Sequence, residues 1–212
     1  GAGVVVLETL EHAENRGARI LAEVLGYGSG ADSYRVTDLH PDGRGGVRAM
    51  KLAMADAGVT PGEIDLISAH GTSTQQNDRV ETVAIKQAFG ADAYRVPVSA
   101  IKSMLGHLGA ASGAVQFVAT VQALRENIIP ATTNYETPDP ECDLDYVPNE
   151  CRRATIGLAL SNSFGFGGQN AALVLRECAK PATGVDGLRA QPFIDGAVDD
   201  ALQLAAMDRE LR

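Results

Sequence analysis

Short apolar runs alternate along this chain with segments whose apolar residues recur at helical spacing. The runs are rich in β-branched residues and are typical of buried strands, at residues 4–8, 20–27, 64–69, 95–100, 156–160 and 171–175. Helical spacing is found at 47–57, 80–88 and 108–124, and a short polar helical turn is expected at 11–16. Gly58 and Gly90 follow two of these segments and predict helix ends.

Strands and helices alternate through the middle of the chain, and two strands then follow each other directly. This order predicts an α/β layered domain over residues 1–178, with a mixed, mostly parallel sheet packed between helices and an antiparallel pair at its end. Pro97 indicates that the strand at 95–100 lies near an edge. Four prolines predict a long loop at 130–150.

The composition changes after Cys178. Residues 180–184 are expected to form a linker, and residues 195–211 an amphipathic helix. Two interpretations of this tail, 179–212, remain open. It is either a cover over the chain's own surface or a docking helix for a partner.

Composition and charge exclude several classes of protein. The 212 residues carry a formal net charge of −9, with a pI of about 4.9, which argues against nucleic acid or an anionic membrane as a partner. The helix at 108–124 carries four polar residues and predicts a buried helix rather than a membrane span. Three cysteines without a close pair indicate neither a disulfide framework nor a metal site, and a cytoplasmic location is expected. The chain opens on a valine run with no secretory signal, as if within a longer protein.

Candidate chemistry lies where the predicted parallel strands end. His70 directly follows the strand at 64–69, and His107 follows the strand at 95–100 by a short loop that contains Lys102. A third strand end is followed by a glycine- and phenylalanine-rich turn at 161–168. Because functional groups gather past the carboxyl ends of parallel strands, we expect these three segments to meet at one rim.

Two neutral imidazoles aimed at one oxygen would stabilise a developing enolate or oxyanion. Lys102 and Glu81 are expected to pair and to set the charge of the site. The alternatives are structural histidines and a surface ion pair of little energetic weight. The set contains no activated nucleophile, since none of the three cysteines opens a helix.

Three motifs together identify a resemblance. They are His70-Gly71-Thr72-Ser73-Thr74, Lys102-Ser103-Met104-Leu105-Gly106-His107 and Asn162-Ser163-Phe164-Gly165-Phe166-Gly167-Gly168. In this order and spacing, residues 1–177 resemble the C-terminal half of a β-ketoacyl-(acyl carrier protein) synthase, a condensing enzyme with the thiolase-like fold. Residues 75–82 and 139–148 look closest to the catalytic ketosynthase subunit of type II polyketide synthases, with the fatty-acid elongating enzyme as the near neighbour.

The resemblance implies roles for individual residues. His70 and His107 would bind the malonyl thioester carbonyl and stabilise the enolate, while Lys102 would pair with Glu81. Phe166 would be the gating phenylalanine and would contribute a backbone N–H, with Phe164, Gly165 and Asn162 beside it. Thr72 and Thr74 would contact the phosphopantetheine arm.

The resemblance also implies partners. The family's nucleophilic cysteine belongs to the N-terminal half, so it would lie on a missing half or a separate chain. Acyl carrier protein would deliver the substrate on its phosphopantetheine, no covalently bound cofactor or metal is expected, and the ketosynthase units would dimerise. A non-catalytic partner subunit, which binds carrier protein or sets chain length, is the alternative.

One position departs from the family. Nine residues after the second histidine the family usually has a glutamate near a buried cation or water network, and this chain has Gln116. A neutral amide cannot balance a cation as a carboxylate does. The sequence therefore puts any ion at this place in doubt.

Overall fold

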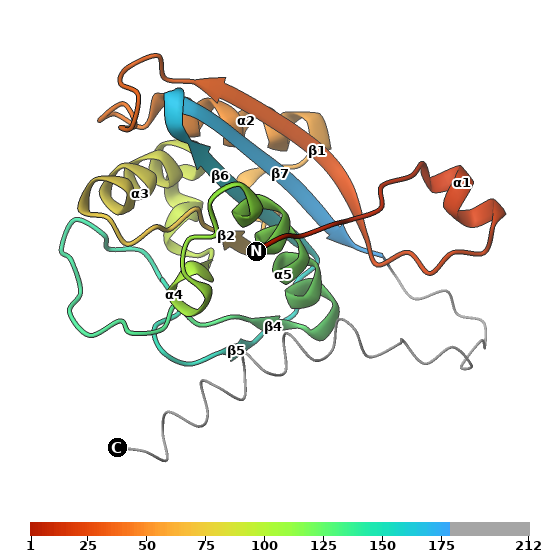
Figure 1. Cartoon of the computed structure of the whole chain (residues 1–212). Coiled ribbons are helices and arrows are strands. Elements are labelled where there is room, and N and C mark those ends of the chain that lie inside the picture. The colour runs from red at the N-terminus through yellow and green to blue at the C-terminus, as the bar shows by residue number, and fades with distance from the viewer. Residues whose placement is uncertain (179–212) are drawn as a thin grey trace. The chain divides into compact units, whose positions relative to one another are not determined.

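A five-stranded sheet organises the chain (Figure 1). The computed structural model describes residues 1–178, and the predicted linker and tail helix lie outside these residues. The strands stand in the order β1 (Ala22–Ala31), β7 (Gln169–Glu177), β6 (Leu158–Gly165), β2 (Leu66–Ser68) and β3 (Val98–Ser99). β6, β2 and β3 are mutually parallel, and β7 runs antiparallel to both of its neighbours, so four strands share one direction.

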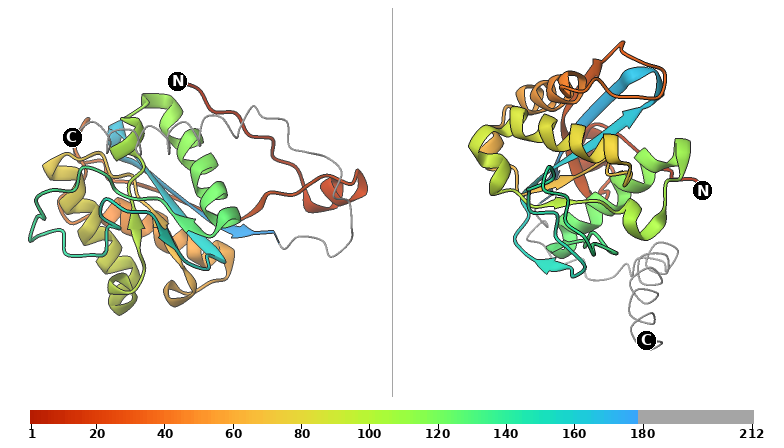
Figure 2. Two further views of the ribbon diagram at one scale, coloured as in Figure 1. Left: turned by 90° about the horizontal axis from the view of Figure 1, so that it is seen from below. Right: turned by 90° about the vertical axis from the view of Figure 1, so that its left-hand side faces the viewer.

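Helices cover both faces of the sheet. α2 (Arg44–Ala57) and α3 (Gln75–Phe89) lie on one side, and α5 (Ser112–Glu126) lies on the other, as the right-hand view of Figure 2 shows. Neighbouring strand residues serve opposite cores: Ile67 and Leu160 pack toward α2 and α3, whereas Leu66 and Ala159 pack toward α5. This period-2 alternation places apolar side chains on both faces, as a sheet between helices requires. The predicted layered α/β fold is confirmed.

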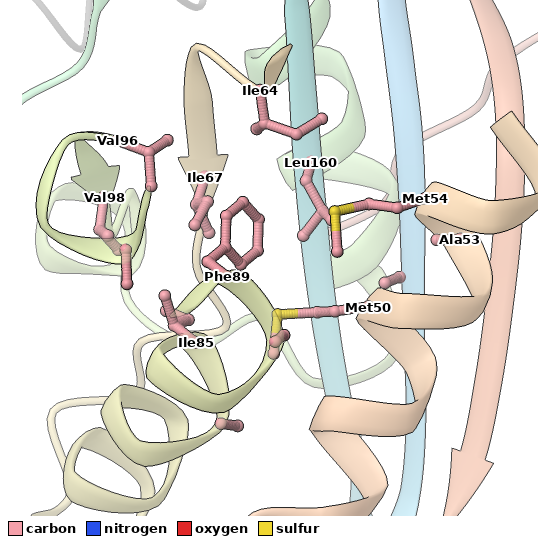
Figure 3. Close-up of a cluster of buried hydrophobic side chains, with 14 of the residues drawn as sticks. Met50, Ala53, Met54, Ile64, Ile67, Ile85, Phe89, Val96, Val98 and Leu160 are labelled. Carbon is pink, nitrogen blue, oxygen red and sulfur yellow. The ribbon is translucent and has the colours of Figure 1, made fainter. Parts of the chain in front are cut away.

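The larger core lies under α2 and α3 (Figure 3). Met50, Ala53 and Met54 recur at helical spacing on α2 and meet Ile85 and Phe89 of α3 above the sheet, and all five are buried. Gly58 ends α2 with φ 67°, a left-handed conformation that glycine adopts without strain. The sequence prediction of these two helices is confirmed.

Close packing of β1 on α2 depends on two glycines. A Cβ atom at Gly26 or Gly28 would overlap backbone atoms of α2 at Ala53 and Ala49. The absence of a side chain therefore lets the helix lie directly on the strand.

The remaining elements are short. They are α1 (Leu10–Asn15), α4 (Lys102–Leu105), the 3₁₀ turns Pro61–Glu63, Gly90–Tyr94, Gly109–Ala111 and Phe166–Gly168, and a two-stranded sheet of β4 (Ile128–Ile129) and β5 (Arg152–Arg153). The loop between β4 and β5 confirms the expected irregular segment at 130–150. β3 lies at the edge of the sheet, as Pro97 predicted. Among residues 1–178, no helix has the length and apolar character needed to cross a membrane.

Two predictions are wrong. Residues 4–8 form no strand, and Val4, Val6 and Leu7 are 88%, 83% and 70% exposed. A strand needs a hydrogen-bonded neighbour, and no other part of residues 1–178 pairs with this segment. The helix expected at 108–124 begins only at Ser112. Its buried residues are half polar and half apolar, while Val115 and Phe117 are only half-buried.

Candidate active site

The two histidines come together because their strands are neighbours. His70 lies two residues beyond the end of β2, and His107 lies two residues beyond α4, which directly follows β3. Their ring centroids are 5.6 Å apart and the rings are nearly perpendicular, at 86°. Phe164, from the end of β6, lies with its ring centroid 5.6 Å from that of His70. The expected meeting of three strand ends at one rim is confirmed.

A cavity of about 670 Å³ opens at this rim. Its wall includes His107, Lys102, Glu81 and Thr72, together with Ala69 and Gly71, which flank His70 in the chain. The rest of the wall comes from Ser73, α3, the segment at 98–106 and the loop at 132–146. The cavity is therefore lined by polar and charged side chains and is large enough for a substrate.

Glu81 anchors the turn that follows β2. Its carboxylate accepts hydrogen bonds from the backbone N–H groups of His70 and Gly71, each at 2.9 Å, and from the side-chain amides of Asn162 at 3.2 Å and Asn77 at 3.5 Å. Burial raises the pKa of Glu81, and these donors together with the charge of Lys102 oppose the rise. Since all four partners donate, the geometry is that of an ionised carboxylate.

The expected direct pair of Lys102 and Glu81 is not formed. Lys102 Nζ instead donates to Gln116 Oε1 at 2.9 Å, and no ion pair within 4.0 Å joins it to Glu81. The carboxylate is occupied by backbone donors, so the ammonium takes the nearest acceptor on α5. Burial lowers the pKa of Lys102, and the charge of Glu81 acts against this shift across the gap.

Gln116 closes the buried network. Its side chain is 1% exposed, and Nε2 donates toward Ser68 O at 2.9 Å, Asn162 O at 2.8 Å and Ser161 Oγ at 3.1 Å. The amide therefore presents its acceptor to Lys102 and its donors to oxygen atoms on β2 and β6. The network then holds one carboxylate, Glu81, and one ammonium, Lys102, which balance each other.

The surroundings of the two imidazoles set the charge of one ring and the tautomer of the other. Burial, the charge of Lys102 and the nearby His107 lower the pKa of His70 to about 3, so this ring is uncharged at neutral pH. The Nδ1 atom of His107 accepts from the backbone N–H of Gly109 at 3.1 Å. Because an amide can only donate, the proton of a neutral His107 ring lies on Nε2.

A family model described as "Beta-ketoacyl synthase, C-terminal domain" matches residues 21–136, more than half of the chain. The chain belongs to the β-ketoacyl synthase family. The resemblance inferred from the three motifs is thus confirmed.

Two curated relatives show the extent of the match for this ketosynthase domain. Both are named 3-oxoacyl-[acyl-carrier-protein] synthase 2. The protein from Synechocystis sp. is 51% identical over 177 residues, which cover 84% of this chain and 42% of the relative. The protein from Coxiella burnetii is 50% identical over 175 residues, or 82% of this chain and 42% of the relative. The chain spans about 42% of the length of these relatives.

Solved ketosynthases have the same fold. One structure contains a type II polyketide synthase acyl-carrier protein in complex with its ketosynthase, bound to the hexaketide; it matches with a TM-score of 0.79 and 43% identity. The ishigamide ketosynthase/chain length factor matches with a TM-score of 0.77 and 44% identity. Each match covers 81% of this chain and 42% of the other. The predicted thiolase-like architecture is confirmed.

The other predicted site residues of the ketosynthase domain are placed unequally around the cavity. Thr72 lines it, whereas Thr74 caps α3 by accepting from Asn77 N at 3.3 Å. Asn162 is fully buried and holds Glu81 from behind, which fits a positioning role better than contact with substrate. Gly165 and Phe166 are not among the residues of the cavity wall, and Phe166 is 78% exposed. The gating and oxyanion roles of the Phe166 segment stay predictions.

Two of the three cysteines have thiols whose surroundings disfavour the thiolate. Cys142 lines the cavity, but burial raises the pKa of its thiol. Cys151 is exposed, and burial also raises the pKa of Cys178. Since the thiolate is the reactive form, Cys142 and Cys178 are not activated as nucleophiles.

Two residues of the site were missed by the sequence analysis. Asn77 donates to Glu81, and Ser112 contacts His107 Nδ1 at 2.8 Å. The spacing of Ser112, Gln116 and Thr120 at i, i+4 and i+8 placed three polar residues on one face of an apolar helix. That stripe was the available signal.

Proposed function

We propose that this domain supplies the decarboxylation and oxyanion machinery of a β-ketoacyl synthase. The reaction is the decarboxylative Claisen condensation of malonyl-carrier protein with an acyl thioester. The observation that carries the proposal is the pair of imidazoles, with ring centroids 5.6 Å apart at adjacent strand ends, beside the buried ammonium of Lys102. The nucleophilic cysteine is supplied by the N-terminal half or by a partner chain.

The chemistry is set by the donors. The malonyl thioester loses carbon dioxide, and the electron pair of the broken C–C bond becomes an enolate with its charge on the thioester oxygen. His70 and His107 donate N–H bonds to that oxygen, which need not be protonated because both donors are fixed in advance. The enolate carbon attacks the acyl thioester on the cysteine, the thiolate leaves, and a β-ketoacyl thioester remains on the carrier.

Neutrality of the imidazoles matters in this scheme. A protonated imidazole would transfer its proton to the enolate and quench the nucleophilic carbon. Lys102 opposes protonation of His70 through its positive charge. Lys102 therefore acts on the charge state of the site, while the histidines contact the reacting oxygen.

The substrate would arrive on the phosphopantetheine of acyl carrier protein. Thr72, which lines the cavity wall, and Thr74 would contact the arm. The working unit we propose contains this chain, the cysteine-bearing half and a second copy of both, in the cytoplasm. We call this chain combined with the cysteine-bearing half the assembled protein.

The test separates decarboxylation from acylation. In the assembled protein, His70→Ala or His107→Ala should lower release of carbon dioxide from malonyl-carrier protein by about 10²–10³, the usual effect of removing one preorganised donor. Acylation of the cysteine should change little. His12→Ala, on the exposed turn α1, is the matched control. Near-normal carbon dioxide release by both variants would refute the assignment.

The same assay tests the alternative of a non-catalytic partner that sets chain length. If this chain were such a subunit, replacing His70 or His107 would not change carbon dioxide release by the mixture. The complete set of His70, His107, Lys102 and Glu81, with Glu81 and Lys102 held by buried hydrogen bonds, favours the catalytic proposal.

A further inference from the structure

Helix α5 carries a buried polar stripe toward the site. Ser112, Gln116 and Thr120 lie one turn apart and are 9%, 1% and 2% exposed. Gln116 holds Lys102, and Thr120 donates to the backbone carbonyl of Gln116 at 2.8 Å. Ser112 is the member of the stripe that faces a histidine.

The hydroxyl of Ser112 makes two hydrogen bonds whose directions are fixed. Ser112 Oγ accepts from the backbone N–H of Leu108 at 2.9 Å, and an amide can only donate. The hydroxyl proton is therefore free for the second partner, His107 Nδ1, at 2.8 Å. Since Nδ1 also accepts from Gly109 N–H at 3.1 Å, the ring nitrogen meets two donors.

We infer that Ser112 is a positioning residue that holds His107 in the Nε2–H tautomer and fixes its ring. The inference rests on the proposed function in one respect, namely that the Nε2 proton of His107 points at the enolate oxygen. The Gly109 bond is longer and comes from a turn whose Gly109 has φ 60°. Ser112, at the start of a helix of 15 residues, supplies the shorter contact from a rigid element.

A purely structural role for Ser112 is the alternative. The bond from Leu108 N would then tie the turn to the helix, and the contact to the imidazole would be incidental. The two roles predict different effects of removing the hydroxyl. A structural role changes stability alone, whereas a positioning role also changes where the imidazole proton lies.

The first arm of the experiment measures the tautomer. This chain, with its four histidines labelled with ¹⁵N in the imidazole ring, is assembled with an unlabelled cysteine-bearing half. Wild type should show an unprotonated Nδ1 for His107. Ser112→Ala should add a population with a protonated Nδ1, and Ser112→Thr, which keeps the hydroxyl, should not.

The second arm measures the rate of carbon dioxide release. Ser112→Ala should lower it by roughly 3- to 10-fold, the range expected for one hydrogen bond, and Ser112→Thr should restore most of it. Thr120→Val is the matched control, because it removes a buried hydroxyl from the same helix without touching a histidine. It should lower stability comparably and leave the tautomer and the rate unchanged.

An unchanged tautomer and rate in a folded Ser112→Ala variant would overturn the inference. A loss of rate in Thr120→Val equal to that in Ser112→Ala would do so as well. If the wild-type assembly releases no carbon dioxide, the proposed function fails instead. The tautomer arm then still decides the role of Ser112.

Discussion

Replacing Gln116 by glutamate tests how the buried charges of the site are balanced. The amide nitrogen of Gln116 lies 2.9 Å from Ser68 O and 2.8 Å from Asn162 O, and both are carbonyl oxygens that can only accept. A glutamate carboxylate in the same place would point an oxygen that can only accept hydrogen bonds at these two carbonyl oxygens. It would also add a second negative charge to a network that Glu81 and Lys102 already balance.

The cost can be worked from these contacts. Each carbonyl left without a donor costs about 1–3 kcal/mol, and the new charge pair with Lys102 gains little after desolvation. We expect Gln116→Glu to lower the free energy of unfolding by about 2–6 kcal/mol, the sum for the two carbonyls. At roughly 2–4 °C per kcal/mol for a chain of this size, the drop in Tm is at least about 4 °C.

The penalty should depend on pH in a defined direction. Burial beside two carbonyls raises the pKa of the introduced carboxyl above its unfolded value of about 4.3. Below that value the carboxyl is neutral in both states, so the extra cost is small. It grows as pH rises through the folded pKa, which makes the variant weaker at pH 7 than at pH 4 relative to wild type.

The assay is a melting scan of the assembled protein, with and without added potassium or magnesium. A cation coordinated by the carboxylate and the two carbonyls should relieve part of the cost in Gln116→Glu and leave wild type unchanged. Gln122→Glu is the control, because it places the same charge on the same helix beside Arg125. Equal responses to salt in wild type and Gln116→Glu, or a Tm loss no larger than that of Gln122→Glu, would refute this reasoning.

Three further predictions concern the site and the exposed surface. Glu81→Gln should lower the free energy of unfolding by about 2–4 kcal/mol in urea titrations, because an amide cannot accept from both His70 N and Gly71 N on two oxygens; wild-type stability would contradict the anchoring role. Because the pKa of His70 is lowered to about 3 in the folded protein, the contribution of neutral His70 to the free energy of unfolding is constant above pH 6.5 and is lost as pH falls toward 3, by up to about 1.4 kcal/mol per pH unit. A plot of stability against pH for His70→Gln should lack this part of the acid slope, and identical slopes for the variant and wild type would disprove the prediction. The isolated chain, with Val4, Val6 and Leu7 at 88%, 83% and 70% exposure, should self-associate in size-exclusion chromatography, whereas a monodisperse monomer with a cooperative melt would count against this.

The fold was predictable where local pattern and tertiary packing agree. α2 and α3 have apolar residues at helical spacing and a glycine stop, and both form as expected. Residues 4–8 have an equally clear strand pattern and form none, because pairing depends on a neighbour that the pattern does not report. β4 and β5 were missed for the opposite reason, since two-residue strands carry almost no periodic signal.

The residue types of the site were predictable, but not their connections. Strand ends brought His70, His107 and Phe164 together as the parallel order implied. The predicted partner of Lys102 was wrong because the Glu81 carboxylate accepts hydrogen bonds from backbone N–H groups, which sequence spacing cannot show. Ser112 and Gln116 lie on one face of α5, but only the contacts reveal which of them faces the imidazole and which faces the ammonium.

The central claim is that this chain provides the groups that decarboxylate the malonyl unit. The most direct measurement is release of labelled carbon dioxide from malonyl-carrier protein by the cysteine-bearing half alone, with the wild-type chain, and with the His70→Ala, His107→Ala double variant. We predict release only in the mixture with the wild-type chain. Equal release by the cysteine-bearing half alone, or by the mixture with the double variant, would contradict the claim.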